Sequence, residues 1–559
     1  MNSPLGRLLH LPPPRTRYSV EADVRIPMRD GVELRATHYA PRDGARGTVL
    51  IRTPYGRGLP ASLLQGRMLA ARGYHVVVAS VRGTFGSGGT FVPMAQETAD
   101  GQDTVAWLRT REWFDGRLAT LGASYLGWTQ WTLLLDPPPE LKMAVIAVGP
   151  HDFRDAVFGT GAFTLGDFLS WSHQITGQEH RGLNRIRHLT TARRRVRPGL
   201  QGLPLADAAE PVLQGRAPWY REWLSHPEDS DPFWDAYRAG PALERVAVPV
   251  LLISGWQDLF LDQTLTQYET LRARGADVSL LIGPWTHFGV ATKGATRTEP
   301  ATLAWLDHYV AGSASSGPAG TASSGLAGTA PSGLAGTAPS GLAGTVSVFR
   351  TGEEKWHDLP QWPPATRPRT FTLTADGTLT SAKSAPPGAV IFRYDPQDPT
   401  PSVGGRVLSG TMGVRDNRKL ESRGDVVTFT APAFTTDLDL AGTPALEIDI
   451  SVDNPYADVF ARLCDVDPSG RSHNFSDALL RLDPSVPPGV VQRLTLRLDP
   501  CFHRVRAGHR LRLQVSGGAH PRFARNLGTD GKPENGAELA PSVHTIHCGQ
   551  SRLIVPTTA

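Results

Sequence analysis

One serine of this chain stands where a catalytic nucleophile could be held. Ser124 lies in the stretch Gly-Ala-Ser-Tyr-Leu-Gly (122–127), directly after the apolar run 118–121. Strand, glycine, serine, glycine and helix in this order predict a nucleophile elbow, a sharp turn that exposes a serine hydroxyl at the end of a sheet. In the common pattern the second glycine comes two residues after the serine, whereas here it is Gly127. A Gly-Ser turn that only ends a buried strand is the competing interpretation.

The partners that such a serine needs follow it in the required order. A serine nucleophile requires a base that accepts its proton and a carboxylate that orients the base. Asp258 follows the apolar segment 248–254, and His287 follows the segment 278–282. In doubly wound hydrolases the acid and then the histidine follow later strands, at the sheet edge that carries the serine. The sequence therefore predicts a Ser124–His287–Asp258 triad.

Each partner has an alternative. Asp262 is a rival acid four residues after Asp258, but we expect it to cap the N-terminus of the next helix, which favours Asp258. A lone histidine at position 287 would more often be a core residue bonded to a backbone carbonyl. That interpretation leaves the order of Ser124, Asp258 and His287 unexplained.

Acyl transfer also needs two donors for the developing oxyanion. The backbone amide of Tyr125, the residue after the nucleophile, is the first. Lipases supply the second from a glycine run after the third strand, but the corresponding loop here is Thr-Pro-Tyr (53–55). The Tyr55 hydroxyl is the substitute donor, and packing is the alternative role for this side chain.

Other polar and aromatic groups are candidates for binding roles. The glycine-rich loop 81–89 lacks the lysine of a phosphate-binding loop, so we expect it to shape the site instead. Three histidines of the segment 152–240 are not spaced as zinc ligands on a helix, and cap surface or substrate contact is expected for them. They are His173, His180 and His188. The aromatic residues Trp128, Trp256 and Phe260 are candidates for substrate binding.

The elements that position these residues alternate along the first 312 residues. Asp-Gly at 30–31 between two alternating runs predicts a hairpin over 19–46. Apolar strands are expected at 47–52, 74–80, 118–121, 142–148, 248–254 and 278–282, and helices at 61–72, 95–110, 262–273 and 299–311. In the helix 95–110 we expect Val105, Ala106 and Leu108 to face inward. This alternation predicts a mostly parallel, doubly wound sheet of the α/β-hydrolase type.

The chain is expected to divide into five segments. The hydrolase domain comprises 1–151 and 241–312, and is interrupted by 152–240, whose aromatic and helical pattern predicts a cap. Residues 313–346 contain four near-copies of a small-residue octapeptide and are expected to be a flexible loop or linker. Short alternating runs separated by Pro, Gly and Asp turns predict a β jelly roll over 347–559.

Composition excludes several classes of protein. At 559 residues the chain is too long for one core, and a net charge of +4 without lysine-rich tracts argues against nucleic-acid or membrane-surface binding. Three widely spaced cysteines suggest neither disulfides nor a metal cluster, and no signal peptide or spanning segment is apparent. We expect a cytoplasmic protein with no cofactor and no metal. The sequence leaves assembly into a homodimer open.

Taken together, the motifs resemble those of the bacterial cocaine esterase (CocE/NonD) family, which is related to X-prolyl dipeptidyl peptidases and α-amino acid ester hydrolases. They are Arg-Thr-Pro-Tyr at 52–55, Arg-Gly-Thr at 82–84 with Gly-Ser-Gly-Gly at 86–89, the stretch 122–127, Trp-Gln-Asp at 256–258, Gly-Pro-Trp-Thr-His at 283–287, Trp356 and Asp-Asn-Arg at 416–418. The similarity spans nearly the whole chain. The late glycine at 127 is this family's own pattern.

The resemblance implies roles for these residues. It implies Ser124 as nucleophile with Asp258 and His287 as partners, and it favours Tyr55 with the Tyr125 amide as the oxyanion hole. Two departures stand out: Gln257 replaces a tyrosine usual in the family, and the octapeptide repeat is not a family feature.

The expected function is therefore hydrolysis of a small-molecule acyl ester or amide. Amino-ester hydrolases of the family hold a substrate ammonium with a carboxylate cluster, and no matching cluster is evident, although Asp152, Asp155 and Asp167 are open to test. A plain carboxylesterase is favoured over an X-prolyl peptidase or an amino acid ester hydrolase. A glycan- or polymer-binding protein on the same scaffold is the non-catalytic alternative.

Overall fold

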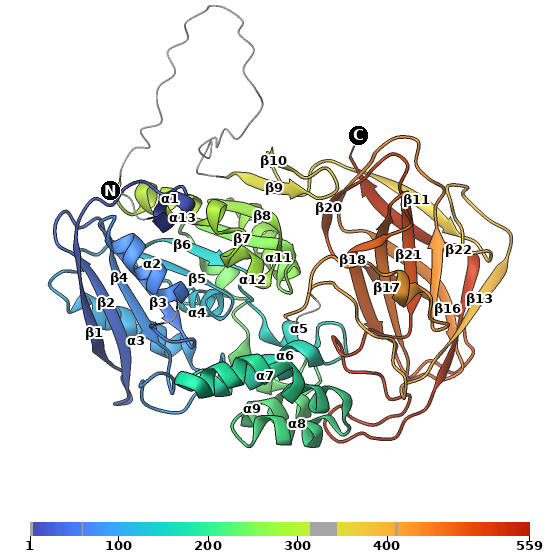
Figure 1. Cartoon of the computed structure of the whole chain (residues 1–559), viewed down its shortest axis with the longest axis horizontal. Helices are drawn as coiled ribbons and strands as arrows, with labels where there is room; N and C mark the ends of the chain where they lie inside the picture. The colour runs from blue at the N-terminus through green and yellow to red at the C-terminus, as the bar shows by residue number, and fades with distance from the viewer. Residues whose placement is uncertain (1–3, 59, 313–343, 409–411, 559) are drawn as a thin grey trace, which may run out of the picture.

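The computed structural model describes residues 4–58, 60–312, 344–408 and 412–558 (Figure 1). Two sheet-bearing parts lie side by side, with a group of helices below the junction between them. Of the predicted linker 313–346, residues 313–343 lie outside the described part of the chain, so the expectation of flexibility stays a prediction.

A ten-stranded sheet forms the first part, in the order β1-β2-β4-β3-β5-β6-β7-β8-β9-β10. Its strands are β1 (Tyr18–Pro27), β2 (Glu33–Pro41), β3 (Thr48–Thr53), β4 (His75–Ser80), β5 (Leu118–Ala123), β6 (Leu141–Ala147), β7 (Val250–Gln257), β8 (Val278–Thr286), β9 (Val346–Arg350) and β10 (Lys355–Leu359). The run from β4 to β9 is parallel, and β1 and β2 form the predicted antiparallel hairpin. The apolar runs thus build an α/β-hydrolase-like sheet.

Helices flank this sheet where the strands cross over. They are α1 (Pro4–Leu8), α2 (Pro60–Ala70), α3 (Glu97–Arg109), α4 (Tyr125–Leu133), α11 (Leu261–Ala273), α12 (His287–Ala291) and α13 (Ala295–Tyr309). In α3, Val105 and Leu108 are buried as predicted, but Ala106 is exposed and Trp107 faces the core instead. The larger aromatic side chain takes the inward position because it removes more apolar surface from water.

The segment between β6 and β7 is helical throughout. It contains α5 (Phe153–Phe158), α6 (Leu165–Gly177), α7 (Gly182–Gln201), α8 (Leu205–Leu213), α9 (Pro218–Ser225), a 3₁₀ turn (Pro232–Tyr237) and α10 (Ala242–Arg245). Aromatic side chains that pack edge to face, such as Phe153 on Phe168 and on Trp223, hold these short helices together. Their apolar residues join the same core as the sheet.

The C-terminal part is a β domain with its own core. One sheet contains β11 (Arg367–Leu373), β12 (Leu379–Thr380), β13 (Gly388–Tyr394), β15 (Leu438–Gly442), β16 (Ala445–Val452), β19 (Gln492–Arg497), β20 (Cys501–Val505) and β22 (Ser542–Thr557). The second contains β14 (Val426–Thr430), β17 (Asp458–Val466), β18 (Ser472–Arg481) and β21 (Arg510–Ser516), and the short α14 (Arg418–Glu421) precedes β14.

Two strands at the predicted domain boundary at residue 347 belong to the hydrolase sheet. β9, which begins at Val346, and β10 extend that sheet rather than the C-terminal sheets. β9 pairs in parallel with β8, from Leu280↔Val346 to Ile282↔Val348. The alternating pattern of these two strands is the same as that of the later strands, so only their pairing partners reveal to which sheet they belong.

Candidate active site

Ser124 lies in the turn between β5 and α4, in a strained backbone conformation. Its φ of 63° and ψ of −123° are rarely adopted by residues other than glycine. A Cβ atom on Gly122 would lie 2.2 Å from the Cβ of Leu126, so the glycine allows the chain to turn this sharply.

The glycine at 127 has a separate packing role. A Cβ atom there would lie 2.6 Å from the Cα of Gly149, which follows β6. The first turn of α4 can therefore lie directly against the backbone beyond the neighbouring strand. Close packing of helix and strand thus explains a glycine at 127, one position later than in the common pattern.

His287 and Asp258 meet at the carboxyl ends of β8 and β7. The Nδ1 atom of His287 lies 2.7 Å from Oδ1 of Asp258, and both side chains are buried. The other oxygen of Asp258 accepts hydrogen bonds from the Ser254 hydroxyl at 3.0 Å and from the Phe260 amide at 3.2 Å. Both carboxylate oxygens are therefore used, which fixes the orientation of the acid and, through it, that of the imidazole.

The Tyr55 side chain reaches the serine from the loop after β3. Burial raises the pKa of the Tyr55 hydroxyl, while hydrogen bonds with Trp171 and with the Ser124 side chain act in the opposite direction. The Trp171 indole N–H donates to the Tyr55 oxygen at 3.2 Å. A phenol held in this way beside the serine remains protonated and can donate to an oxyanion.

Tyr125 is the first residue of α4, so its amide belongs to the helix turn whose N–H groups lack intrahelical acceptors. Its ring lies between two aromatic neighbours: it meets Tyr55 edge on at 6.4 Å and stacks on Trp171 at 6.4 Å. The structure thus brings together Ser124, Tyr55 and the amide-bearing Tyr125.

Two residues of α6 lie near the site: Trp171, which the sequence analysis does not single out, and Asp167, which it leaves open to test. Trp171, on α6, was not distinguishable among the many aromatic residues of the helical segment. Asp167, also on α6, is buried and accepts a 2.8 Å hydrogen bond from the Leu408 amide of the C-terminal domain. Burial raises its pKa to about 6, and the charges of His287 and Asp258 also act on it.

Two of the three aromatic candidates for substrate binding are buried. Trp128 is fully buried and its indole N–H donates to the Met94 carbonyl at 2.9 Å. Trp256 is buried and donates to the Phe349 carbonyl at 2.6 Å. These contacts favour packing roles, and a substrate contact for either indole stays a prediction. Phe260 packs edge on against His287 at 5.5 Å and stays a candidate.

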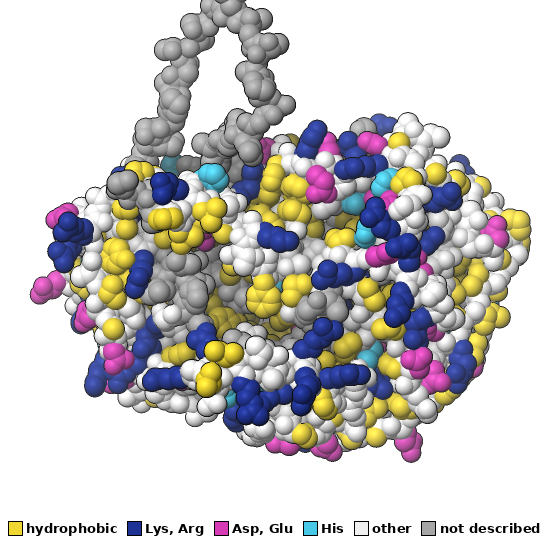
Figure 2. Space-filling model, in the orientation of Figure 1, with side chains coloured by type: hydrophobic (Ala, Val, Ile, Leu, Met, Phe, Trp, Pro, Cys, Tyr) yellow, Lys and Arg dark blue, Asp and Glu magenta, His cyan; other side chains and the backbone are white. Residues whose placement is uncertain are grey.

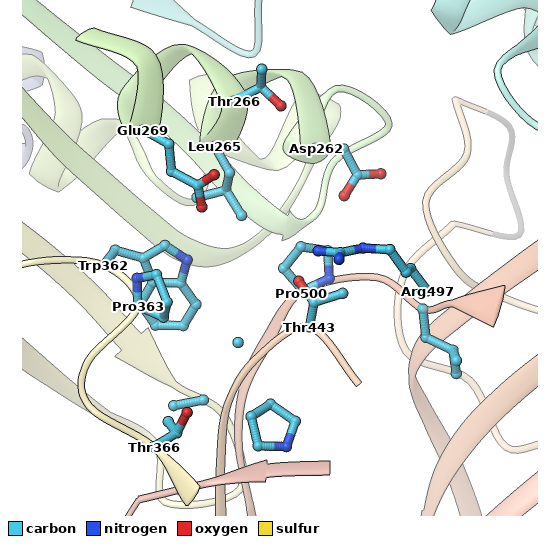
Figure 3. A pocket seen from close by; sticks show the side chains of 14 residues that line it. Asp262, Leu265, Thr266, Glu269, Trp362, Pro363, Thr366, Thr443, Arg497 and Pro500 are labelled. Atoms are coloured by element: carbon cyan, nitrogen blue, oxygen red, sulfur yellow. The ribbon is translucent and has the colours of Figure 1, made fainter. Parts of the chain in front are cut away.

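The rival acid Asp262 lies away from the histidine. It does not cap α11, contrary to the prediction, because Phe260 is at the cap position and Asp262 lies in the first turn. It forms a 2.6 Å ion pair with Arg406. It also lines a cavity of about 480 Å³ between α11 and the C-terminal domain, opposite Arg497 and Pro500 (Figure 3). This cavity is formed by groups other than the predicted triad.

Of the remaining candidates, His173 and His188 line a cavity together with Asp167, whereas Asp152 and Asp155 bond neighbouring groups. His173 and His188 stack at 4.4 Å, and burial lowers the pKa of both. Asp152 caps α5 through the Asp155 amide, and Asp155 accepts a hydrogen bond from Gln263. Within the described residues no group of three His, Cys, Asp or Glu side chains could hold a metal ion, and no helix is long and apolar enough to cross a membrane.

The C-terminal domain also reaches the site. A Cβ atom on Gly413 would lie 3.2 Å from the Cγ2 atom of Thr286, the residue before His287. A cavity of about 550 Å³ lies between α6, α7 and the C-terminal domain, and Asp167, Val407 and Arg522 line it. The face of the molecule drawn in Figure 2 has a hollow near its middle that contains hydrophobic side chains. Lys and Arg side chains lie along the lower edge of this hollow.

Comparisons with known proteins show which families the chain is similar to. Residues 30–289 match the model of X-Pro dipeptidyl-peptidase (S15 family), and residues 342–553 match that of the X-Pro dipeptidyl-peptidase C-terminal non-catalytic domain. The cocaine esterase of Rhodococcus sp. (strain MB1 Bresler) is 29% identical, over 96% of this chain and 98% of that protein.

Solved structures share the whole fold. An aminopeptidase from a marine sediment archaeon, Thaumarchaeota archaeon, superposes with a TM-score of 0.78 at 21% identity, with 97% of each chain covered. An α-amino acid ester hydrolase superposes with a TM-score of 0.76 at 22% identity and the same coverage. At these identities the superpositions establish the α/β-hydrolase-like fold and the C-terminal β domain.

Proposed function

We propose that Ser124, His287 and Asp258 are the residues through which this chain, a cocaine esterase-like (CocE/NonD) serine hydrolase, cleaves ester bonds. The 2.7 Å contact between Nδ1 of His287 and Oδ1 of Asp258, at the sheet edge that carries Ser124, supports this assignment. Among the described residues, Ser124 is also the one serine that the fold holds at a positive φ.

The mechanism follows from the hydrogen bonds of the site. With Nδ1–H of His287 donated to Asp258, Nε2 is left to accept the Ser124 proton as Oγ attacks the acyl carbon. The oxyanion of the tetrahedral intermediate then accepts hydrogen bonds from the Tyr55 hydroxyl and the Tyr125 amide. Protonated His287 gives its proton to the departing alcohol, and water releases the acyl group from Ser124 by the reverse sequence.

The helical segment would act as a cap, and the C-terminal domain as a jelly roll that leans on the site. Two contacts support this division. Trp171 of α6 holds the Tyr55 hydroxyl, and Leu408 of the C-terminal domain donates to Asp167 of α6. Both parts therefore contribute to the surroundings of the acyl group, and both are expected to influence substrate choice.

The acyl ester is the favoured substrate class over X-prolyl peptides and aminoacyl esters. Recognition of a substrate ammonium requires carboxylates directed to the acyl group. Asp152 is engaged by Arg238 and by the α5 amide, and Asp155 by Gln263. A panel of acyl esters, aminoacyl esters and Xaa-Pro amides tests the preference: the highest kcat/KM on aminoacyl esters or Xaa-Pro amides would reverse it.

The catalytic assignment has its own test. A fluorophosphonate probe should label the folded wild-type chain at Ser124, and Ser124→Ala should neither be labelled nor hydrolyse p-nitrophenyl acetate. Absence of labelling in folded wild-type protein would favour a glycan- or polymer-binding protein on a hydrolase scaffold. Labelling elsewhere would reassign the nucleophile.

A cytoplasmic location and a small-molecule substrate complete the proposal. Cys464, Cys501 and Cys548 are unpaired and buried, which suits a reducing compartment. No nucleic-acid or membrane partner is proposed, and a homodimer remains open to a measurement of mass in solution.

A further inference from the structure

A buried ion pair lies directly beneath the predicted nucleophile elbow. Nη2 of Arg52 lies 2.6 Å from Oε2 of Glu97, and both side chains are almost wholly shielded from water. Nη1 of Arg52 also donates to the Glu97 carbonyl at 2.8 Å. Gly101, one turn further along α3, makes room for the guanidinium, since a Cβ atom there would lie 2.7 Å from Nη1.

The same carboxylate holds the side chain of the residue after the serine. The Tyr125 hydroxyl donates to Oε1 of Glu97 at 2.7 Å and accepts from the Met94 amide at 3.0 Å. Hydrogen bonds from a neutral donor to a buried carboxylate are among the stronger ones in proteins. The Tyr125 ring is therefore fixed at both its hydroxyl and its aromatic faces.

This cluster connects the two elements that carry the oxyanion donors. Arg52 is the last residue but one of strand β3, three residues before Tyr55. Its carbonyl accepts a 3.4 Å hydrogen bond from the Thr129 hydroxyl of α4. Tyr125 lies at the start of α4, next to Ser124. Glu97 thus joins the end of β3 to the start of α4 through one carboxylate.

We propose that Arg52 and Glu97 are positioning residues, which hold the Tyr125 amide and the β3 end that bears Tyr55 at the separation an oxyanion requires. This inference rests on the proposed function of Ser124. Donors to a developing charge act only when their positions are fixed in advance, and displacement by about 1 Å can lower the rate on the order of 10²-fold. A carboxylate with two charged or polar partners, in a buried setting, supplies that rigidity.

The chain offers a matched control at the opposite end of the same strand. The Tyr74 hydroxyl donates to Oδ1 of Asp307 at 2.6 Å, and Arg46 pairs with that oxygen at 2.6 Å. Arg46 lies before β3 and Tyr74 before β4, at the amino ends of the parallel strands. This cluster has the same chemistry of tyrosine, carboxylate and arginine but lies away from the carboxyl edge where Ser124 is.

The experiment compares Tyr125→Phe with Tyr74→Phe in the full chain. Both variants keep the ring and lose one hydroxyl bonded to a carboxylate, and Tyr125→Phe retains the amide. Active sites are counted with the fluorophosphonate probe, and kcat and KM for p-nitrophenyl acetate are measured per labelled site. The affinity for a phenylboronic acid, whose serine adduct is tetrahedral and anionic, is measured alongside.

We expect Tyr125→Phe to lower kcat and boronate affinity in parallel, on the order of tenfold or more, with KM changed less than about twofold. Tyr74→Phe should keep kcat within about twofold of wild type. Glu97→Gln should also lower kcat and boronate affinity. In the double variant with Tyr125→Phe it should add little further loss, because both substitutions act on the same Tyr125–Glu97 hydrogen bond.

Equal kcat per labelled site in Tyr125→Phe and Tyr74→Phe would overturn the proposal and leave Arg52–Glu97 as a stabilising pair only. A fall in kcat without loss of boronate affinity would also overturn it, because the oxyanion donors would then be intact. Failure of the wild-type chain to label would instead contradict the function of Ser124, so the two failures are distinguishable.

Discussion

The hydrolase domain and the C-terminal β domain each bury an aspartate, but with different partners. Asp258 contacts His287, an imidazole that can act as a general base. Asp477 contacts Arg462 at 2.9 Å and Arg522 at 2.5 Å, two groups that stay charged. Burial alone would raise the pKa of Asp477, yet the arginines hold it at about 2.

The difference shows which role the buried carboxylate has in each of the two domains. Beside a histidine, the carboxylate orients a base and can stabilise the imidazolium that forms during proton transfer. Between two arginines, the carboxylate neutralises permanent charges, and the cluster fixes backbone, as Arg462 does by donating also to the Val403 carbonyl. The first arrangement is suited to catalysis and the second to holding a fold.

The largest effect that separates the two regions is expected for Asp258→Asn. Because the amide can hold His287 in the wrong tautomer, kcat should fall on the order of 10⁴-fold while the fold is retained. Steady-state hydrolysis of p-nitrophenyl acetate, normalised to protein that unfolds cooperatively in urea, measures this. A loss below about tenfold would remove Asp258 from the triad.

Asp477→Asn should show the reverse profile. Removing the charge leaves two buried arginines without compensation, so the free energy of unfolding should fall by about 3–5 kcal/mol. The kcat per labelled site should change less than about tenfold. Urea denaturation and active-site titration on the same preparation measure both quantities; unchanged stability would show that the cluster is not structural.

Tyr55→Phe extends the comparison of the two domains to buried tyrosine hydroxyl groups. Loss of an oxyanion donor should lower kcat on the order of 10²- to 10³-fold. The control is Tyr394→Phe, in the C-terminal domain, where the hydroxyl is buried and has no partner among the described residues. That variant should leave kcat unchanged. If the two variants behave alike, Tyr55 packs against the site without donating to substrate.

The smallest effect concerns Asp167, whose buried carboxylate has neither a histidine nor an arginine in hydrogen-bond contact among the described residues. Its pKa is about 6 when folded, above the ordinary 3.8, so the folded state favours the protonated form. The resulting stability is present at low pH and is lost as the pH rises through 6.

Asp167→Asn should therefore remove a pH dependence rather than add one. Relative to wild type it should gain stability on the order of 3 kcal/mol at pH 8 and little at pH 4. Urea midpoints of both chains at the two pH values measure this, and equal differences at both would contradict the raised pKa.

The sequence by itself determined the order and local setting of the catalytic candidates. Apolar runs located the strands, because burial on both faces of a parallel sheet leaves a continuous pattern. The glycines at 122 and 127 located the turn, because only a residue without a Cβ atom tolerates those close approaches. The positions of Asp258 and His287 after later strands followed from the same rules.

Only the tertiary structure decided which distant side chains share a site. The hydrogen bonds Trp171–Tyr55 and Tyr125–Glu97, and the pairing of β9 with β8, join residues that no local period relates. Burial likewise showed that Trp128 and Trp256 are core residues, since an aromatic side chain has the same pattern in a core as at a binding surface. Local propensity acts over a few residues, whereas these contacts arise when separate elements pack.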